Sequence, residues 1–285
     1  MSEPSVSVVI PTYNRRELVA RAVRSVLRQS FEGFELIVVD DASDDGTAEL
    51  LDELARSDGR LRPIILERHL GTPGAVRNRG AAAARAPLIA LLDSDDRWLP
   101  EKLERQVPFH RDVGVRLSHT RELWMREGKR VSQRGQTHRR EGMIFEDALK
   151  KCIIGPSTTI LERSLWEEHG GFDEELEVAE DYELWLRVTA RERVGYLDEA
   201  LTEKHAGPWQ QLSERYGQIE GFRIEALRRV LRTEALPEER IAPAKRELAR
   251  KLHIFALGAR KRGRPEEAAR LEAEAADLET GEESL

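Results

Sequence analysis

The chain has 285 residues, enough for one large α/β domain or for a domain with an appendage. Its formal net charge is −7 with both signs interspersed, which argues against a general nucleic-acid-binding protein, because such proteins carry a strongly basic surface. Cys152 is the only cysteine, so we expect no intramolecular disulfide framework and no thiolate metal site, as is typical of a reducing compartment.

These features lead us to expect a cytoplasmic protein. The first residues lack the basic and apolar regions of a signal peptide, and no apolar run approaches the roughly 18 residues that span a bilayer. Neither observation excludes peripheral contact with the inner face of a membrane.

Strand and helix patterns alternate through the first hundred residues. Runs rich in apolar and β-branched residues predict strands at residues 6–10, 34–39, 61–66 and 88–92. The segments between them predict helices that begin near residues 15, 47 and 75. Asn14, with Glu17 three residues later, resembles a capping box at the start of the first helix. This alternation predicts a parallel, doubly wound sheet.

Polar residues follow three of these predicted strands. They are Thr12-Tyr13-Asn14, Asp40-Asp41 and the run from Asp93 to Asp96. In an open α/β sheet the carboxyl ends of parallel strands meet at one edge, where ligands bind. Asp93, Asp95 and Asp96 repel one another unless a cation or protons offset their charge, and oxygen ligands suit Mg²⁺ or Mn²⁺. The alternative is a polar turn in which one aspartate caps the next helix. The convergence of three strand ends favours a binding site.

The second half is less regular. Its predicted elements, in order, are a hairpin over 115–125 and 129–132, a helix over 144–151, a strand over 157–161, helices over 164–169 and 180–188, a strand over 194–197, and a loop over 202–208 that contains His205. From about residue 211 onward the pattern indicates charged amphipathic helices, of which Gly263-Arg264-Pro265 separates the last two.

Several motifs occur in the order found in the family 2 glycosyltransferases. They are Val8-Val-Ile-Pro-Thr-Tyr-Asn14, Val38-Val-Asp-Asp-Ala-Ser43, Ala75-Val-Arg-Asn-Arg-Gly80, Leu92-Asp-Ser-Asp-Asp-Arg-Trp98 and Gly170-Gly-Phe-Asp173 with Glu180-Asp181. The chain resembles this family over residues 5–210. The resemblance implies an α/β GT-A fold, with a doubly wound, mostly parallel sheet. It also implies a glycosyltransferase domain at 1–210, divided into a nucleotide-sugar-binding half (1–100) and an acceptor-binding half (101–210), and a helical C-terminal extension at 211–285.

The activity that the resemblance implies is transfer of a sugar from a nucleoside-diphosphate sugar to an acceptor hydroxyl, usually with inversion. The acceptor would be a glycan, a lipid-linked compound or a small molecule, and the setting would be cell-surface glycan or polysaccharide biosynthesis. No nucleic-acid partner is expected. The helices after residue 211 could cover the acceptor cleft, form a homodimer or touch a membrane, but a solvated helical cap is the simpler interpretation.

The resemblance places the donor site on residues of four motifs, namely Pro11, Thr12, Tyr13, Asn14, Asp41, Arg77, Asp93 and Ser94. Tyr13 would stack on the nucleotide base and Asp41 would accept a hydrogen bond from it, whereas the alternatives are a packed aromatic and a turn cap. Asp93 and Asp95 match the outer positions of the family's Asp-X-Asp (DXD) motif. Asp95 would bind Mn²⁺ or Mg²⁺, Asp93 would bind the ion or the ribose, and the ion would offset the charge on the departing diphosphate.

On the acceptor side, Asp181 matches the base of the family's Glu-Asp motif and would accept the proton of the acceptor hydroxyl. Glu180 and Gly171 would contribute to acceptor binding. The alternative is that both acids only complement the dipole of their helix. His205 lies where family members place a histidine on the diphosphate or the metal, but the aromatic residue that usually precedes it is missing, which leaves an ordinary loop histidine as the alternative.

Three rival functions share some of these ingredients. A magnesium-dependent receiver module has its acid pair after the first strand, where this chain has Pro11 to Asn14. A sugar nucleotidyltransferase needs a glycine- and lysine-rich triphosphate loop at the same point, and the sequence lacks one. A non-catalytic nucleotide-sugar-binding or assembly protein would have no need of Asp181.

Overall fold

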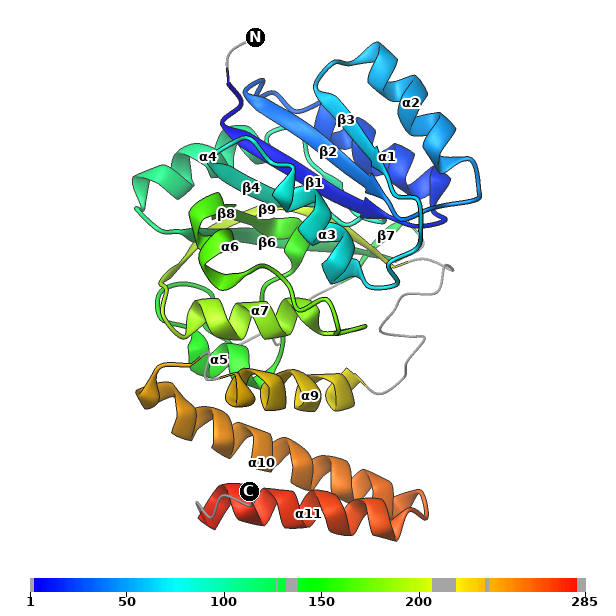
Figure 1. The fold of residues 1–285 in the computed structure, drawn as a ribbon. Coiled ribbons are helices and arrows are strands. Elements are labelled where there is room, and N and C mark those ends of the chain that lie inside the picture. Colours follow the sequence, from blue (N-terminus) through cyan, green and yellow to red (C-terminus); the bar gives the residue numbers. More distant parts are fainter. Residues whose placement is uncertain (1–2, 127, 132–137, 207–218, 234–235, 281–285) are drawn as a thin grey trace.

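The computed structural model describes residues 3–126, 128–131, 138–206, 219–233 and 236–280. The strands in these ranges form one sheet in the order β3-β2-β1-β4-β8-β6-β9-β5, with β7 paired to β6 (Figure 1). The strands are β1 (Val6–Thr12), β2 (Phe34–Asp40), β3 (Leu61–Ile65), β4 (Leu88–Leu91), β5 (Arg97–Trp98), β6 (Leu117–Arg126), β7 (Lys129–Val131), β8 (Thr159–Glu162) and β9 (Val194–Ala206).

Helices cover both faces of the sheet and continue beyond it. They are α1 (Arg16–Leu27), α2 (Thr47–Ser57), α3 (Pro73–Ala82), α4 (Lys102–Asp112), α5 (Phe145–Lys150), α6 (Arg163–His169), α7 (Glu180–Thr189), α9 (Ile219–Arg232), α10 (Glu238–Lys261) and α11 (Pro265–Thr280), with a short 3₁₀ helix at Pro156–Thr158. No helix in the described ranges has the length and apolar character needed to cross a bilayer.

The first four strands are parallel, as predicted. Both faces of β1, β2 and β4 are buried, whereas β3 at the edge of the sheet is partly exposed. Because successive side chains of a strand point to opposite faces, β1 contributes to two cores. Val8 and Ile10 pack with residues of α1, α2 and α4, whereas Val9 packs with residues of α3, α6 and α7. Gly80 lets α3 approach the sheet closely, since an added Cβ would lie 2.4 Å from Cγ1 of Val9.

The start of α1 differs from the predicted capping box. Asn14 has a φ of 49°, and its Oδ1 accepts a hydrogen bond from the backbone N–H of Asp44 at 2.9 Å. The helix begins at Arg16, and no side chain caps it from position 15. The prediction was wrong because the side chain of Asn14 is used to join the β1 and β2 loops, a contact that local sequence does not reveal.

The loop predicted at residues 202–208 was also wrong for its described part. β9 continues through Ala206, pairs in parallel with β6, and pairs antiparallel with β5 near Thr202. His205 therefore lies on a strand. The strand extends because distant partners on both sides satisfy its backbone groups, which a local pattern cannot show. Residues 207 and 208 lie outside the described residues.

The C-terminal helices α9, α10 and α11 lie in successive layers at the end of the molecule opposite the N-terminus (Figure 1). α10 and α11 share a small apolar cluster of Ala256, Ala259 and Ala268, but most of their buried residues belong to a larger core. Leu227 of α9 and Leu248 of α10 share one apolar cluster with Phe145 of α5 and with Tyr182 and Leu186 of α7. The helices after β9 are thus packed on the helix that carries the acids Glu180 and Asp181.

Candidate active site

A pocket of about 940 Å³ lies at the carboxyl ends of the parallel strands. Pro11 to Tyr13 reach it from the end of β1, Asp41 follows β2, and the run from Asp93 to Asp96 comes just after β4. Its other walls come from β6, from residues 151–156 and from the start of α7. A pocket therefore lies at the edge of the sheet where the sequence predicts a binding site.

Most of the predicted site residues line this pocket. They are Pro11, Thr12, Tyr13, Asp41, Arg77, Asp93, Ser94, Asp95, Glu180 and Asp181. Asn14, Gly171 and His205 are not among the lining residues in the described part of the chain.

Three carboxylates form a cluster at the floor of the pocket. Asp93, Asp95 and Asp96 each offer an oxygen within 4.8 Å of the others. Burial and the charge of Asp93 raise the pKa of Asp95, and burial with both neighbouring aspartates raises the pKa of Asp96 well above its ordinary value. Arg15 offsets part of this charge, with its Nη1 2.9 Å from Oδ2 of Asp95. The all-oxygen donor set of the cluster fits a hard divalent cation.

Asp96 is the one buried residue of this cluster, and two hydrogen bonds fix its carboxylate. Its Oδ2 accepts a hydrogen bond from the hydroxyl of Ser157 at 2.7 Å, and its Oδ1 accepts one from the backbone N–H of His205 at 3.0 Å. The Ser157 oxygen also accepts the backbone N–H of Asp93 at 3.0 Å. His205 thus contacts the cluster through its backbone, while its Nε2 is 3.2 Å from a carboxylate oxygen of Glu203.

Arg77 joins the acidic cluster to the start of α7. Its Nη2 donates to Oδ1 of Asp93 at 2.7 Å, and its Nη1 donates to Oε1 of Glu180 at 2.6 Å. Burial alone would raise the pKa of Asp93, but Arg77 outweighs it and the pKa is lowered. For Glu180 the balance is the reverse, because burial and the charge of Asp181 raise its pKa to about 7 against the pull of Arg77.

Asp181 faces the pocket from the first turn of α7. Its Oδ2 lies 3.4 Å from the Sγ of Cys152, which can donate a weak hydrogen bond. Burial, followed by the charge of Asp181, raises the pKa of this thiol well above its ordinary value, so it stays protonated. Lys204 lies nearby. Its burial would lower its pKa, but Glu122 and the pocket aspartates raise it. Asp181, the candidate base, therefore has the neutral thiol of Cys152 and the charged ammonium of Lys204 as neighbours.

The ring of Tyr13 is 42% exposed at the end of β1, so it is not an ordinary core aromatic. It stacks on His69, with ring centroids 3.9 Å apart and an interplanar angle of 22°. The Nδ1 of His69 is 2.7 Å from Oδ2 of Asp41, whose Oδ1 accepts the backbone N–H of Leu70 at 2.7 Å. Asp41 thus holds the loop that carries the stacking partner of Tyr13.

Gly171 supports the pocket from outside it. Its φ is 72°, and an added Cβ would lie 2.5 Å from Oδ1 of Asn78, so only glycine fits without a shift. Asn78 bonds both backbone groups of Phe172, and Arg187 donates to the Gly171 carbonyl at 2.7 Å. These contacts fix the segment that leads into α7.

Comparison with known proteins identifies the family. A sequence profile described as glycosyl transferase family 2 matches residues 7–169, more than half of the chain. The chain belongs to this family. It is a glycosyltransferase.

Named relatives are found among bacterial family 2 enzymes. The chain is 34% identical over 204 residues to TuaG of Bacillus subtilis, named for teichuronic acid biosynthesis, and the match covers 70% of this chain and 79% of TuaG. It is 31% identical over 188 residues to WfgD of Escherichia coli, a UDP-Glc:alpha-D-GlcNAc-diphosphoundecaprenol beta-1,3-glucosyltransferase, covering 66% of this chain and 71% of WfgD. An uncharacterized glycosyltransferase of Rickettsia felis is 30% identical, but the match spans only 33% of its length.

Solved structures confirm the predicted GT-A fold. S. aureus TarS 1–349 in complex with UDP-GlcNAc has a TM-score of 0.72 and 25% identity, with 87% of this chain and 72% of that chain covered. The mannosyltransferase PcManGT from Pyrobaculum calidifontis, in complex with GDP-Man and Mn2+, has a TM-score of 0.65 and covers 99% of this chain and 89% of its own. At 18% identity, the second likeness concerns the fold alone.

Sequence reasoning missed several residues of this family 2 pocket. The hydroxyl of Ser157 accepts the backbone N–H of Asp93 and donates to the carboxylate of Asp96. Lys204 lies among the carboxylates of the pocket, whose charges raise its pKa. Cys152 contacts Asp181, and His69 contacts both Tyr13 and Asp41. Only Lys204 carried a signal, because it precedes His205, where family members have a basic residue. The other three are ordinary residues in their local sequence.

Proposed function

We propose that this family 2 glycosyltransferase transfers a sugar from a nucleoside-diphosphate sugar to an acceptor hydroxyl, with inversion, in the biosynthesis of a cell-surface polysaccharide. The observation that carries the proposal is that Asp181 and the cluster of Asp93, Asp95 and Asp96 line the same pocket, although they are far apart in the sequence. The names of TuaG and WfgD support the polysaccharide setting. The diphosphoundecaprenol acceptor in the name of WfgD supports action at a membrane surface, which we propose is the cytoplasmic face.

The donor would lie along the half of the pocket formed by residues 1–100. Tyr13 offers an exposed ring on which a nucleotide base can stack, beside the carboxylate of Asp41. Pro11 and Thr12 continue this wall toward Ser94. The complexes of TarS with UDP-GlcNAc and of PcManGT with GDP-Man support a nucleotide sugar as the donor.

Asp93 and Asp95 would hold a Mn²⁺ or Mg²⁺ ion, which supplies positive charge against the departing diphosphate. The raised pKa of Asp95, caused by burial and by Asp93, supports a cation there. The Mn2+ in the PcManGT complex is consistent with this choice of ion. Arg77 fixes Asp93, and Ser157 fixes Asp96, so the acids keep their positions before the donor binds.

Asp181 would act as the base. The acceptor oxygen forms a bond to the anomeric carbon, the bond to the diphosphate oxygen breaks, and the acceptor proton passes to Asp181. A single displacement of this kind inverts the anomeric centre. Glu180 would line the acceptor side, held by Arg77 at 2.6 Å. Gly171 would support the acceptor site by fixing the backbone that leads into α7. His205 would support the metal site through the hydrogen bond from its backbone N–H to Asp96.

The experiment is a mass-spectrometric screen of the full chain with a panel of nucleotide sugars, with Mn²⁺ or with EDTA. We expect hydrolysis or transfer from one preferred donor in Mn²⁺ only. Asp181→Asn should reduce transfer by about a hundredfold or more, the usual contribution of a general base, while nucleotide binding by calorimetry is unchanged. Transfer by Asp181→Asn at the wild-type rate would contradict the base assignment.

A further inference from the structure

Beyond Asp181, the pocket is lined by basic side chains that the proposed transfer does not use. Three of them flank α5 in the sequence: His138 and Arg140 precede this helix, and Lys151 follows it directly. They are neighbours: burial, followed by the charges of Lys151 and Arg140, lowers the pKa of His138. The carbonyl oxygen of Arg140 is 2.8 Å from Nε2 of His119, which also lines the pocket. We call Lys151, Arg140, His138, His119 and Thr120 the cationic wall. Its positive charge comes from Lys151 and Arg140, because burial lowers the pKa of both histidines and keeps them neutral.

Lys151 is not balanced by an acid. In the described part of the chain it has no hydrogen-bond or ion-pair partner, whereas the adjacent Lys150 lies 3.6 Å from Asp147 and does not line the pocket. Arg140 donates to the hydroxyl of Tyr196 at 2.8 Å and lies over its ring, contacts that orient the guanidinium. The wall therefore carries positive charge that faces the pocket.

Two polar atoms on this wall also lack partners. Oγ1 of Thr120 and Nδ1 of His138 are buried, and neither has a hydrogen-bond partner among the described residues. Thr120 is only 3% exposed, and it follows His119 on β6. A buried polar group without a partner costs about 1–3 kcal/mol, so such groups are normally satisfied by water or by a ligand.

We propose that this cationic wall binds a phosphate group carried by the acceptor. The proposal rests on the proposed function, because it assigns the acceptor half of the same pocket. A phosphate presents several acceptor oxygens and more than one negative charge, which suits a guanidinium, an ammonium, a hydroxyl and an imidazole that line one pocket. A carboxylate could use fewer of these donors.

The position of the wall agrees with such an acceptor. Cys152, the residue after Lys151, has its Sγ 3.4 Å from Oδ2 of Asp181. Lys151 and Asp181 both line this pocket, so one acceptor molecule can reach both groups. The acceptor class is a sugar phosphate or the phosphate-bearing end of a glycolipid.

The first test measures binding of inorganic pyrophosphate to the full chain by calorimetry, in EDTA so that no metal bridges it to the aspartates. Lys151→Ala and Arg140→Ala should each raise Kd about tenfold or more, and Lys151→Arg, which keeps the charge, should retain most of the affinity. Lys150→Ala and Arg139→Ala are matched controls, because they remove the same charge from neighbouring residues outside the pocket lining. Equal Kd values for wild type and Lys151→Ala would overturn the proposal, as would acetate binding as tightly as pyrophosphate.

The second test uses transfer with pairs of acceptors that differ only in a phosphate. For each sugar, an octyl glycoside is compared with the octyl glycosyl diphosphate and with the free glycosyl phosphate. We expect Lys151→Ala to raise KM for the phosphorylated forms about tenfold and to leave KM for the octyl glycoside unchanged. Preference for the octyl diphosphate identifies a lipid source, and preference for the free phosphate a soluble one. An unchanged KM for both phosphorylated forms contradicts the proposal.

Different results would contradict the proposed function and the proposed phosphate site. If no nucleotide sugar of the panel is consumed, the proposed donor and reaction are contradicted, but pyrophosphate binding that depends on Lys151 still supports the phosphate site. If transfer proceeds through Asp181 and pyrophosphate binding ignores Lys151, the function stands and the phosphate subsite is wrong.

Discussion

Arg77 and Glu180 lie 103 positions apart in the sequence, yet Nη1 of the arginine is 2.6 Å from Oε1 of the glutamate, and both side chains are buried. The same guanidinium also holds Asp93 at 2.7 Å. One side chain of α3 therefore ties the cluster of Asp93, Asp95 and Asp96 to the helix that carries the base candidate. The family resemblance assigns Arg77 to the nucleotide site, and in the structure it lines the pocket and bridges two acids.

Replacing Arg77 with alanine should lower the free energy of unfolding by about 3 kcal/mol, because it leaves the buried Glu180 and the partly buried Asp93 without their partner. Transfer should fall with it, since Asp93 and Glu180 lose their positions. Urea unfolding measures the first effect and steady-state kinetics the second. Arg79→Ala on the exposed side of the same helix is the control and should change neither. A loss below about 1 kcal/mol for Arg77→Ala would show that the acids rearrange at little cost.

The raised pKa of Glu180 predicts a pH dependence. Burial and Asp181 hold the carboxyl protonated below about pH 7, and above that value it becomes negative. The ionised form pairs fully with Arg77 and adds negative charge where the acceptor proton must arrive, so kcat/KM should rise through pH 7. Glu180→Gln removes this ionisation, and its pH profile should lack the rise near 7. An identical profile in both proteins would assign the ionisation to another group.

Asp95 provides the test of the metal site. Asp95→Ala should weaken Mn²⁺-dependent nucleotide binding about tenfold or more, because the cluster loses one of its few oxygen ligands. Binding in EDTA should be the same for both proteins. Asp52→Ala, an exposed aspartate of α2, serves as the charge-matched control. Stabilisation of the wild type by a nucleoside diphosphate that is equal with and without Mn²⁺ in thermal shift would refute the ligand role.

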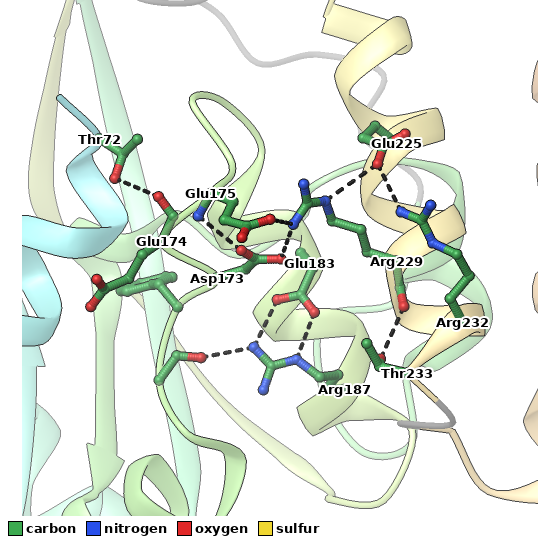
Figure 2. Close-up of polar contacts among 12 residues, drawn as sticks. Thr72, Asp173, Glu174, Glu175, Glu183, Arg187, Glu225, Arg229, Arg232 and Thr233 are labelled. Carbon is green, nitrogen blue, oxygen red and sulfur yellow. Dashed lines mark hydrogen bonds and ion pairs between the residues drawn. The ribbon is translucent and has the colours of Figure 1, made fainter.

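The helix α9 holds the segment that precedes α7, as Figure 2 shows. Nη1 of Arg229 is 2.9 Å from Oδ2 of Asp173 and 2.9 Å from Oε2 of Glu175, while Thr72 on the other side donates to the Glu174 carbonyl at 3.0 Å. The segment is therefore held between α3 and the C-terminal helices.

Arg229→Ala should raise KM for the acceptor several-fold and leave nucleotide affinity unchanged, because it releases only the acceptor side of the segment. Arg229→Lys should retain part of the function, since a lysine keeps the charge that pairs with Asp173 and Glu175. Arg232→Ala is the matched control, as its side chain is 65% exposed and its ion pair is with Glu225 of the same helix. Kinetics with varied acceptor and calorimetry with nucleotide separate the two effects. A uniform loss of stability with unchanged KM would make Arg229 purely structural.

Sequence reasoning determined the parts of this protein that depend on local pattern. Alternating strands and helices predicted the parallel half of the sheet, because burial on both faces demands continuous apolar strands such as 34–39. The polar residues at three strand ends predicted where the pocket lies, because parallel strands end at a common edge. The order of the motifs indicated the family, which the profile match confirmed.

Tertiary structure decided which groups these residues meet. Asn14 bonds Asp44 instead of capping α1, His205 lies on a strand held by β6 and β5, and Arg77 pairs with Glu180. Each of these contacts joins residues that are distant in sequence, and their energies depend on burial and on a partner's position. Local residue spacing determines neither the burial of a side chain nor the position of its partner, so only the folded structure determines the charge balance of the pocket.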